Sequence, residues 1–401
     1  MRAKPFNSTA IMLALGAGQM LAFASSFYLL GVMGDTIAHD LALRPSLVVS
    51  LMSLALLASA LMAATAGRWT DTHGGKRVLI LSNVVFAAGL VVMGMAPGLL
   101  FLAVGLGVIG VGMALGLYGT PFAILVELLG DNARRSITGV ALIGGLGSSL
   151  GWPLTLWLEQ HLGWRGACFA WAGVHVLICL PLAVWMLPAH RPVEHPVVGS
   201  AAAGPAGPAE PVVWDRTMIQ LAILFACAWF ISTCMSTHLP RVLAAFGLTP
   251  ARAAGTAALV GFAAVSVRLA EFTVLRRLPP LATTRIATLG HLTGAACLLT
   301  LGAVAAPALA LGQGAGNGML TVAKGVLPLS LYGSRNYAYR SALLTRPAQF
   351  AQIGGPALYG LALEQSPQVA LALSSGLCLV MFAMTFGLGR HPKPALEEIP
   401  A

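Results

Sequence analysis

Residues 67–77 of this chain read Gly67-Arg68-Trp69-Thr70-Asp71-Thr72-His73-Gly74-Gly75-Lys76-Arg77. This charged, glycine-bearing segment separates two apolar runs, residues 55–66 and 78–96, that contain no charged side chain. A turn this short between two membrane-length helices lies at a membrane face. Its Lys and Arg residues indicate the cytoplasmic face, because short loops rich in these cations stay in the cytoplasm. Its one acid, Asp71, is not needed for that topology signal and requires another explanation.

The composition of the whole chain is typical of an integral membrane protein. Of its 401 residues, 57% are hydrophobic and 9% are charged, whereas soluble proteins carry roughly 25% charged residues. Apolar runs of about 20 residues recur from end to end, each long enough to cross a hydrocarbon core about 30 Å thick. These runs predict helices, because a β-barrel would show ~10-residue alternating segments. The net charge of +10 is spread over loops, so we expect no nucleic-acid partner.

Twelve apolar spans are predicted, six on each side of a linker. Their approximate bounds are 9–33, 46–66, 78–96, 99–126, 136–158, 166–187, 217–238, 253–275, 285–306, 308–331, 341–362 and 367–389. The segment between the sixth and seventh spans is rich in Ala, Gly and Pro, which is typical of a flexible linker. We therefore predict an all-α membrane protein with twelve transmembrane helices in two pseudo-symmetric six-helix bundles. The N-terminal bundle covers residues 1–187, the cytoplasmic linker 188–216, and the C-terminal bundle with a short cytoplasmic tail 217–401.

The distribution of positive charge predicts the orientation. Most Lys and Arg residues fall in loops on the side of residues 67–77, and the other side carries only Arg44, Arg165, Arg241 and Arg252. We therefore expect a multi-pass protein of the plasma (inner) membrane with both termini and the linker in the cytoplasm.

The two halves also share a sequence feature. Residues 110–116 in the fourth span and 312–318 in the tenth are both glycine-rich, with glycines four apart that let a neighbouring backbone come close. Twelve spans in two related halves are the layout of transporters whose site lies at the midplane between the halves.

The sequence contains no recognisable catalytic set. It has no GxSxG motif, no Walker loop, no HExxH motif and no metal-spaced His/Cys cluster, and its six cysteines lie inside apolar runs. We therefore expect no enzyme activity, no cofactor and no metal, with energy supplied by an ion or solute gradient.

The pattern of residues 67–77, a Gly, three residues, an Asp, two residues, a Gly and then basic positions, resembles the signature loop of the major facilitator superfamily. Trp69 and His73 are less usual within it. The span number, central linker and orientation extend the resemblance over the entire chain. It implies transport by alternating access but says little about the substrate.

The resemblance also implies a cytoplasmic latch around this loop. Asp71 would face the N-terminal end of the eleventh span and stabilise its positive dipole end, with Arg340 and Arg346 as possible partners. Arg77 or Arg68 would pair with Glu127 at the end of the fourth span. The implied gating residues are Gly67, Arg68, Asp71, Gly74, Lys76, Arg77, Glu127, Arg134 and Arg346. The alternative is that the cations only set topology and that Asp71 is a simple helix cap.

Two cations lie inside predicted spans, where ionisable residues are costly and usually functional. Arg268 in the eighth span and Lys324 in the tenth each lie roughly 16 residues, or ~24 Å, from the outer end. At similar depth they repel each other unless an anion compensates them. Glu271, one turn from Arg268, is one candidate and also a candidate for coupling. A substrate carboxylate is another, since Arg offers it a two-pronged match.

The placement of Arg268 is similar to that of the arginine in the eighth span of the monocarboxylate transporters and of the oxalate/formate antiporter. Two departures stand out. The monocarboxylate transporters carry an Asp where this chain has Ala264, and the antiporter's second cation is in the eleventh span, whereas Lys324 is in the tenth. The resemblance thus implies anion binding and leaves coupling open. The alternatives are an ion pair between Arg268 and Glu271, or snorkelling to the cytoplasmic interface.

Uncharged polar residues inside the spans supply further binding candidates. Gln19, Tyr118 and Asn317 are predicted to line a cavity together with Arg268 and Lys324, although such residues also serve as interhelical contacts. Asn83, Gln349, Gln352, Tyr28, Trp152, His175 and His291 are weaker candidates.

These features predict a secondary active transporter of a small organic anion. Its partners would be a small-molecule substrate, the lipid bilayer and a coupling proton or counter-anion, and we expect a monomer. The main alternative is a proton-coupled exporter of drugs or toxic compounds with Glu271 as its coupling acid. A third is a membrane sensor or scaffold without transport, which an absence of flux in proteoliposomes would favour.

Overall fold

The computed structural model describes residues 7–188 and 212–388, and these residues form helices joined by short turns. The first half contains α1 (Ser8–Ala24), α2 (Leu29–Asp40), α3 (Pro45–His73), α4 (Gly75–Gly94), α5 (Leu99–Gly116), α6 (Gly119–Leu129), η1 (Gly130–Ala133), α7 (Arg134–Gly144), α8 (Gly147–Val174), η2 (His175–Cys179) and α9 (Leu180–Met186). The second contains α10 (Arg216–Ala245), α11 (Pro250–Thr273), η3 (Leu275–Arg277), α12 (Pro280–Leu301), η4 (Gly302–Ala305), α13 (Ala306–Tyr332), α14 (Tyr337–Gln365) and α15 (Pro367–Met384). Most of the predicted linker, 189–211, and the tail, 389–401, lie outside the described residues.

The helices account for twelve membrane crossings. Within the described residues, nine helical stretches are long and apolar enough to span a membrane. Two of them, Arg134–Met186 and Pro280–Tyr332, have 53 residues and hold two crossings each. The chain turns inside them at Gly163 (φ 68°) and Gly302 (φ 66°), a left-handed conformation that glycine adopts without strain. The polar 29-residue helix α14 completes the set, and the predicted all-α, twelve-helix fold is confirmed.

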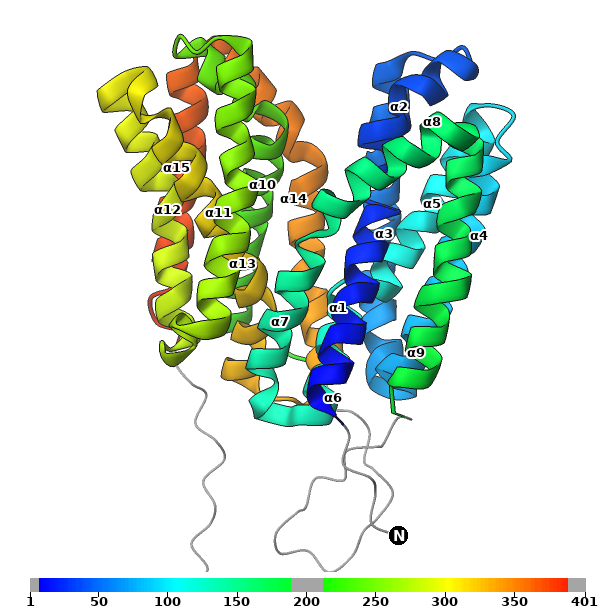
Figure 1. Ribbon diagram of the computed structural model, residues 1–401. Helices are drawn as coiled ribbons and strands as arrows, with labels where there is room; N and C mark the ends of the chain where they lie inside the picture. The colour runs from blue at the N-terminus through cyan, green and yellow to red at the C-terminus, as the bar shows by residue number, and fades with distance from the viewer. Residues whose placement is uncertain (1–6, 189–211, 389–401) are drawn as a thin grey trace, which may run out of the picture.

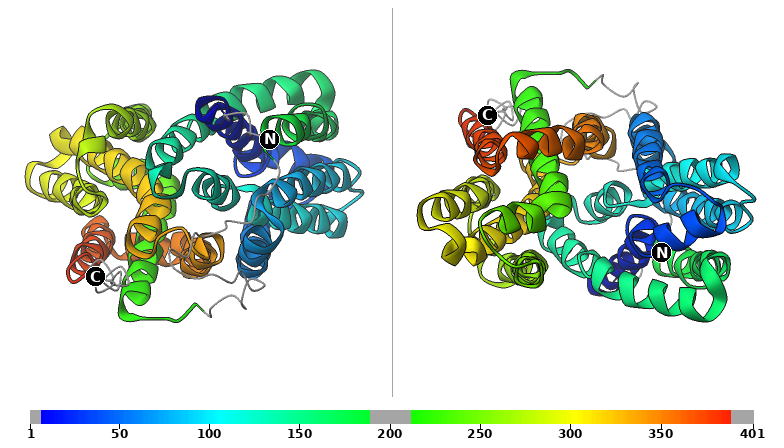
Figure 2. Two further views of the ribbon diagram at one scale, coloured as in Figure 1. Left: turned by 90° about the horizontal axis from the view of Figure 1, so that it is seen from below. Right: turned by 90° about the horizontal axis from the view of Figure 1, so that it is seen from above.

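The two halves form two helix groups that meet near one end (Figure 1). Each group has its own buried apolar cluster, around Phe225 and Leu320 in the second half and around Leu90 and Trp171 in the first. A third cluster joins the groups and contains Ile137 from α7. This third cluster lies toward one end of the molecule. We call that end, which carries residues 67–77, the 67–77 face. Views along the axis show α7 and α14 among the helices between the groups (Figure 2).

Glycines pack the helices of each half in the same way. A Cβ on Gly105 of α5 would lie 3.0 Å from the carbonyl oxygen of Gly89 in α4. In the second half, a Cβ on Gly312 of α13 would lie 2.1 Å from the carbonyl oxygen of Gly290 in α12. The fourth and tenth crossings thus approach their neighbours through small residues, as their glycine-rich sequences predict.

The first span is broken, where the sequence predicted one continuous helix over residues 9–33. Helix α1 ends at Ala24, and α2 begins at Leu29 after a turn. The hydroxyl groups of Ser25 and Ser26 bond back to carbonyl oxygens of the last turn of α1, which competes with helix continuation. Ser25 Oγ also lies 2.8 Å from His175 Nε2. The break moves the following aromatic side chains into the space between the two groups.

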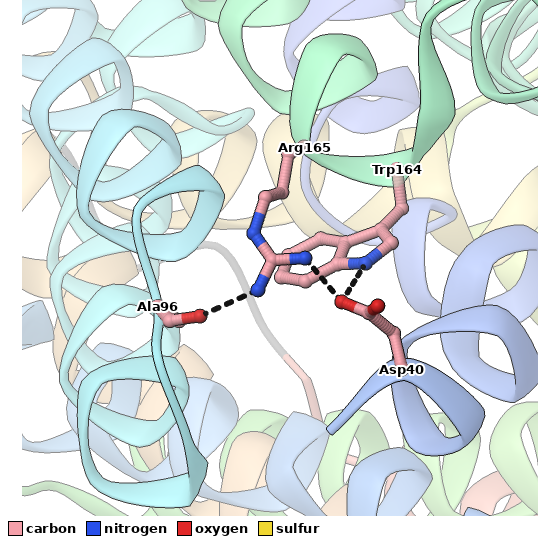
Figure 3. A network of polar contacts seen from close by, with 4 residues as sticks. All are labelled: Asp40, Ala96, Trp164 and Arg165. Carbon is pink, nitrogen blue, oxygen red and sulfur yellow. Dashed lines mark hydrogen bonds and ion pairs between the residues drawn. The ribbon is translucent and has the colours of Figure 1, made fainter. Parts of the chain in front are cut away.

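A polar cluster closes the opposite end of the first group (Figure 3). The carboxylate of Asp40, at the end of α2, forms an ion pair with Arg165 and accepts a hydrogen bond of 3.0 Å from Trp164 Nε1. Arg165 Nη2 donates to the carbonyl oxygen of Ala96, 3.1 Å away, in the turn between α4 and α5. These contacts join α2, α8 and the α4–α5 turn, and they lie within one group.

Candidate functional site

A cavity of about 250 Å³ lies between the two helix groups and takes residues from both. Its lining from the first half includes Phe23, Phe27, Tyr28, Ser59, Tyr118, Phe122 and Gly145. Its lining from the second half includes Trp229, Arg268, Asn317, Thr321, Lys324, Thr345, Gln349 and Gln352. The cavity thus has the position that the two-bundle layout predicts for a transport site.

Arg268 reaches across the cavity from α11 toward the first half. Its side chain is 7% exposed, and its Nη2 donates a hydrogen bond of 3.2 Å to Thr321 Oγ1. A Cβ on Gly145, directly after α7, would lie 2.1 Å from Arg268 Nη1. The guanidinium group therefore fits against α7 because residue 145 has no side chain.

Arg268 and Glu271 do not form an ion pair with each other in the part of the chain that the structure describes. Glu271 is 5% exposed, and its Oε2 has no hydrogen-bond partner. It interacts electrostatically with Arg134 of α7 as well as with Arg268. Arg134 Nη1 donates to the carbonyl oxygen of Leu278, 2.7 Å away, and so links the two groups beside Glu271. Glu271 itself is outside the cavity lining.

Lys324 lines the same cavity from α13. Its ammonium nitrogen lies 4.6 Å from the centroid of the Trp229 ring, which is a cation–π distance. Thr321, the hydrogen-bond partner of Arg268, is one helical turn before Lys324. The two intramembrane cations, far apart in sequence, therefore share one side of the cavity.

The three uncharged binding candidates differ in position. Tyr118 and Asn317 line the central cavity. Gln19 does not, and the structure corrects that expectation: its side chain is 1% exposed, and its Nε2 donates a hydrogen bond of 2.7 Å to the carbonyl oxygen of Gly116 in α5. An amide buried between two apolar helices satisfies a neighbouring carbonyl group, which is the interhelical role that such residues often have. His175 and Asn83 likewise bond to each other in the interior, at 2.9 Å.

Asp71 bonds to the beginning of α14. Its Oδ1 accepts a hydrogen bond of 3.2 Å from the backbone N–H of Ala338, and its Oδ2 accepts one of 2.8 Å from that of Tyr339. The N-cap residue of α14, Asn336, forms no side-chain capping bond of its own. Asp71 therefore caps a helix of the other half and lies at its positive dipole end.

Close backbone packing accompanies this contact. A Cβ on Gly67 would lie 2.7 Å from Ala342 Cβ and 2.9 Å from the carbonyl oxygen of Ala338. Gly74, with φ 84°, ends α3 and starts the turn into α4. The glycines of the 67–77 segment thus serve two needs, namely contact between the halves and a left-handed turn.

Two cations of the segment, Arg68 and Lys76, have contacts that the sequence analysis did not name. Arg68 Nη2 donates to the Tyr339 hydroxyl at 2.6 Å, and its guanidinium carbon lies 4.6 Å from that ring's centroid, so its contact is with α14. Glu127 is an electrostatic neighbour of Asp71. Lys76 Nζ donates to the carbonyl oxygens of Val184 and Leu187, at 2.7 and 2.6 Å, and holds the end of α9.

Two further members of the predicted gating set stand apart from Asp71. Arg77 is exposed. Arg346 is half-buried about two turns beyond the start of α14, and its Nε has no hydrogen-bond partner. Asp71 bonds to backbone groups at the N-terminal end of α14, where the sequence analysis expected it, and of the two suggested arginine partners Arg340 is its electrostatic neighbour.

Several cavity residues escaped the sequence analysis. Ser59, Thr321, Ser341 and Thr345 are small hydroxyl residues, and Phe23 and Trp229 are aromatic residues in apolar runs. Such residues occur throughout membrane helices, so their type carries no signal. Their helix positions show which face they occupy only after the neighbouring helices are known.

Comparison with known proteins agrees with this architecture. The sequence model of the Major Facilitator Superfamily matches residues 15–320. A gallate transporter of Pseudomonas putida is 27% identical over 162 residues, which are 40% of this chain and 35% of that protein. The chain therefore matches about a third of the length of this relative.

Solved structures share the fold at low sequence identity. The human organic anion transporter MFSD10 (TETRAN) has a TM-score of 0.70 at 16% identity, with 95% of this chain and 100% of that chain covered. The fucose:proton symporter FucP in the outward conformation has a TM-score of 0.72 at 13% identity, with 96% and 100% covered. A variant of FucP from E. coli gives 0.73 at 15% identity, with 95% and 98% covered.

Proposed function

Because the chain belongs to the major facilitator superfamily of membrane transporters, we propose that it is a secondary active transporter of a small organic anion. The observation that carries this proposal is Arg268. Its guanidinium group is buried at the central cavity, and within the described residues its one hydrogen bond goes to a neutral hydroxyl group. A buried guanidinium group that forms no hydrogen-bonded ion pair is costly, and Glu271 acts on Arg268 only electrostatically, without a salt bridge in the described part of the chain. A substrate carboxylate would supply the missing partner and accept two hydrogen bonds from Arg268.

Lys324 adds a second positive charge on the same side of the cavity. Two cations at one wall favour anions over neutral or cationic compounds. The partial similarity to a gallate transporter and the fold shared with an organic anion transporter agree with such a substrate.

Transport would occur by rocking of residues 1–187 against residues 217–401 around this site. The 67–77 face would be cytoplasmic in the inner membrane, with both termini on that side, and the working unit would be a monomer. The contacts of Asp71 and Gly67 with α14 would hold the halves together at that face and leave the site open to the other side. Inward opening would break these contacts.

Uptake by proteoliposomes tests the substrate class. Labelled monocarboxylates and dicarboxylates would be offered to the wild type, Arg268→Gln and Arg268→Lys. We expect a loss of at least about 100-fold in uptake for Arg268→Gln, since a buried charged hydrogen-bonding pair contributes several kcal/mol. The lysine variant would retain the charge and lose the two-pronged geometry. Normal uptake by a folded Arg268→Gln protein would rule out the anion site.

A specific observation also supports a second function, proton-coupled export of drugs or toxic compounds. Glu271 is a buried acid with a partnerless oxygen, and it lies beside Arg134 of the other half. Protonation of this acid would change the contact between the halves. Under this alternative, Glu271→Gln abolishes export and spares substrate binding. A small anion carried without proton movement would leave Glu271 as a structural partner of the two arginines.

A further inference from the structure

One side of the cavity is a continuous series of aromatic rings. Tyr118 stacks on Phe122 with centroids 5.1 Å apart and planes at 21°, and the Phe23 ring lies 4.9 Å from that of Tyr118. Phe27 lies 6.5 Å from Phe23, and Tyr28 lies 5.5 Å from Phe27. All five residues line the cavity, and we call them the aromatic wall. The break after α1 positions two of them, Phe27 and Tyr28, whereas Phe23 lies in the last turn of α1.

The cationic group lies at the edge of this wall. A Cβ on Gly144 would lie 2.9 Å from the Tyr118 hydroxyl, and a Cβ on the next residue, Gly145, would lie 2.1 Å from Arg268 Nη1. The hydroxyl end of Tyr118 and the guanidinium group therefore occupy neighbouring positions against α7. An anion bound by Arg268 would have its carbon skeleton next to the rings of Tyr118 and Phe23.

A third side of the cavity is polar and uncharged. It comes from α3 and α14, with Ser59 and Gln349 in contact: Gln349 Nε2 donates to Ser59 Oγ at 2.8 Å. The carbonyl oxygen Oε1 of Gln349 has no hydrogen-bond partner. Thr345 lies one turn earlier on the same helix and also lines the cavity. The lining residues on this side are polar, and none of them carries a charge that would bind a second ion.

We propose that the transported anion is a hydroxylated aromatic carboxylate. This inference rests on the proposed function, since it requires Arg268 to bind the carboxylate. The ring would pack against the aromatic wall in the offset or edge arrangements that aromatic pairs prefer, and a ring hydroxyl would face the polar side formed by Ser59, Thr345 and Gln349. The volume of about 250 Å³ suits a single ring, because sites for drug-sized ligands measure roughly 300–1,000 Å³.

Binding of matched acids to the purified full-length protein tests the inference. Labelled 4-hydroxybenzoate would be displaced by benzoate, by cyclohexanecarboxylate and by hexanoate. These competitors share the carboxylate and differ in the hydroxyl group, the π-system and the ring. We expect benzoate to bind about tenfold more tightly than cyclohexanecarboxylate, and 4-hydroxybenzoate more tightly than benzoate.

Three variants assign these preferences to residues. Phe23→Leu should reduce the preference for benzoate over cyclohexanecarboxylate to about threefold or less. Gln349→Leu should remove the advantage of the hydroxyl group and leave the ring preference. Trp157→Leu is the matched control, since Trp157 is a 53% exposed aromatic residue of α8 outside the cavity lining. Size-exclusion profiles would establish that each variant is folded, and ratios between ligands remain valid if overall affinity falls.

The outcomes separate the two proposals. Equal binding of benzoate and cyclohexanecarboxylate by the wild type, with both lost in Arg268→Gln, would overturn the aromatic substrate and keep the anion site. Binding that is unchanged in Arg268→Gln would overturn the anion site itself. An aromatic preference that survives Phe23→Leu would remove the aromatic wall as its origin. A wild type that binds none of the acids would overturn the aromatic substrate as well.

Discussion

The carboxylate of Asp71 caps a helix far along the chain: its Oδ2 lies 2.8 Å from the backbone nitrogen of Tyr339, 268 residues later. This bond joins the last turn of α3 to the start of α14, and thus one half of the transporter to the other. Because α14 has no capping side chain of its own, the cap exists only while the halves are together at the 67–77 face.

Substitution of Asp71 tests this link. Asp71→Asn keeps the shape but removes the negative charge at the dipole end, which is worth about 1 kcal/mol. We expect an about fivefold shift in population toward the form open at the 67–77 face. Spin-label distances between α3 and α14 would measure that shift. Asp35→Asn, which removes an exposed acid of α2, is the control and should leave the distances unchanged.

Gly67 permits the close contact between α3 and α14 because it has no side chain. In Gly67→Val, the new side chain would meet Ala342 and the α14 backbone, because a Cβ alone would lie within 2.7 Å of the former. We expect a folded protein that cannot close at this face, with transport reduced more than tenfold. Gly107→Ala of α5, where a Cβ would meet nothing within 4 Å, should transport normally. Closure of the valine variant to the wild-type distance would contradict this packing.

Gly145 should control the anion site from the other half. In Gly145→Ala, the Cβ would occupy space now filled by Arg268 Nη1. The flexible end of the arginine side chain can move aside, so we expect little change in thermal stability and an about tenfold weaker carboxylate affinity. Titration calorimetry and a melting curve would separate the two effects. A fall in stability with unchanged affinity would show that the glycine serves helix packing instead.

Lys324 should strengthen binding without replacing Arg268. Lys324→Gln removes one of two cations at the cavity, and we expect about tenfold weaker binding of carboxylates. Lys324→Arg should retain most of the affinity. Arg252→Gln removes an exposed cation of α11 and should have no effect at ordinary ionic strength, since exposed charges are screened. Equal losses in Lys324→Gln and Arg252→Gln would indicate a general effect of net charge.

Much of the fold follows from sequence pattern, because hydrocarbon imposes a strict length and composition on each crossing helix. The break in the first span was not predicted. It depends on Ser25 bonding to carbonyl oxygens of α1 and to His175, a residue of the sixth span. In sequence, Ser25 and Ser26 are two small residues in an apolar run, and only the neighbouring helix makes a turn there favourable.

The candidate site was predicted in part. Arg268 and Lys324 stood out because a charge in an apolar span is rare, and both line the cavity. Gln19 stood out as an uncharged polar residue in an apolar span, but it bonds to the carbonyl oxygen of Gly116, since its role depends on which backbone group of α5 faces it. Tyr118 and Tyr28 were named as candidates, but the wall that they form with Phe23, Phe27 and Phe122 could not be recognised, because aromatic residues are ordinary in membrane helices.

The 67–77 segment shows which features the sequence determines by itself and which depend on the tertiary structure. By itself the sequence determined that a charged segment lies between the second and third spans and that its motif resembles the superfamily's, because short-range chemistry fixes a glycine turn and a charge excess. In the structure that turn is at Gly74, and residues 67–73 continue α3. The tertiary structure alone decided that Asp71 bonds to the α14 backbone, that Arg68 lies on Tyr339 and that Lys76 holds α9. Partners hundreds of residues apart depend on how two separately packed helix groups meet, and no local pattern encodes that geometry.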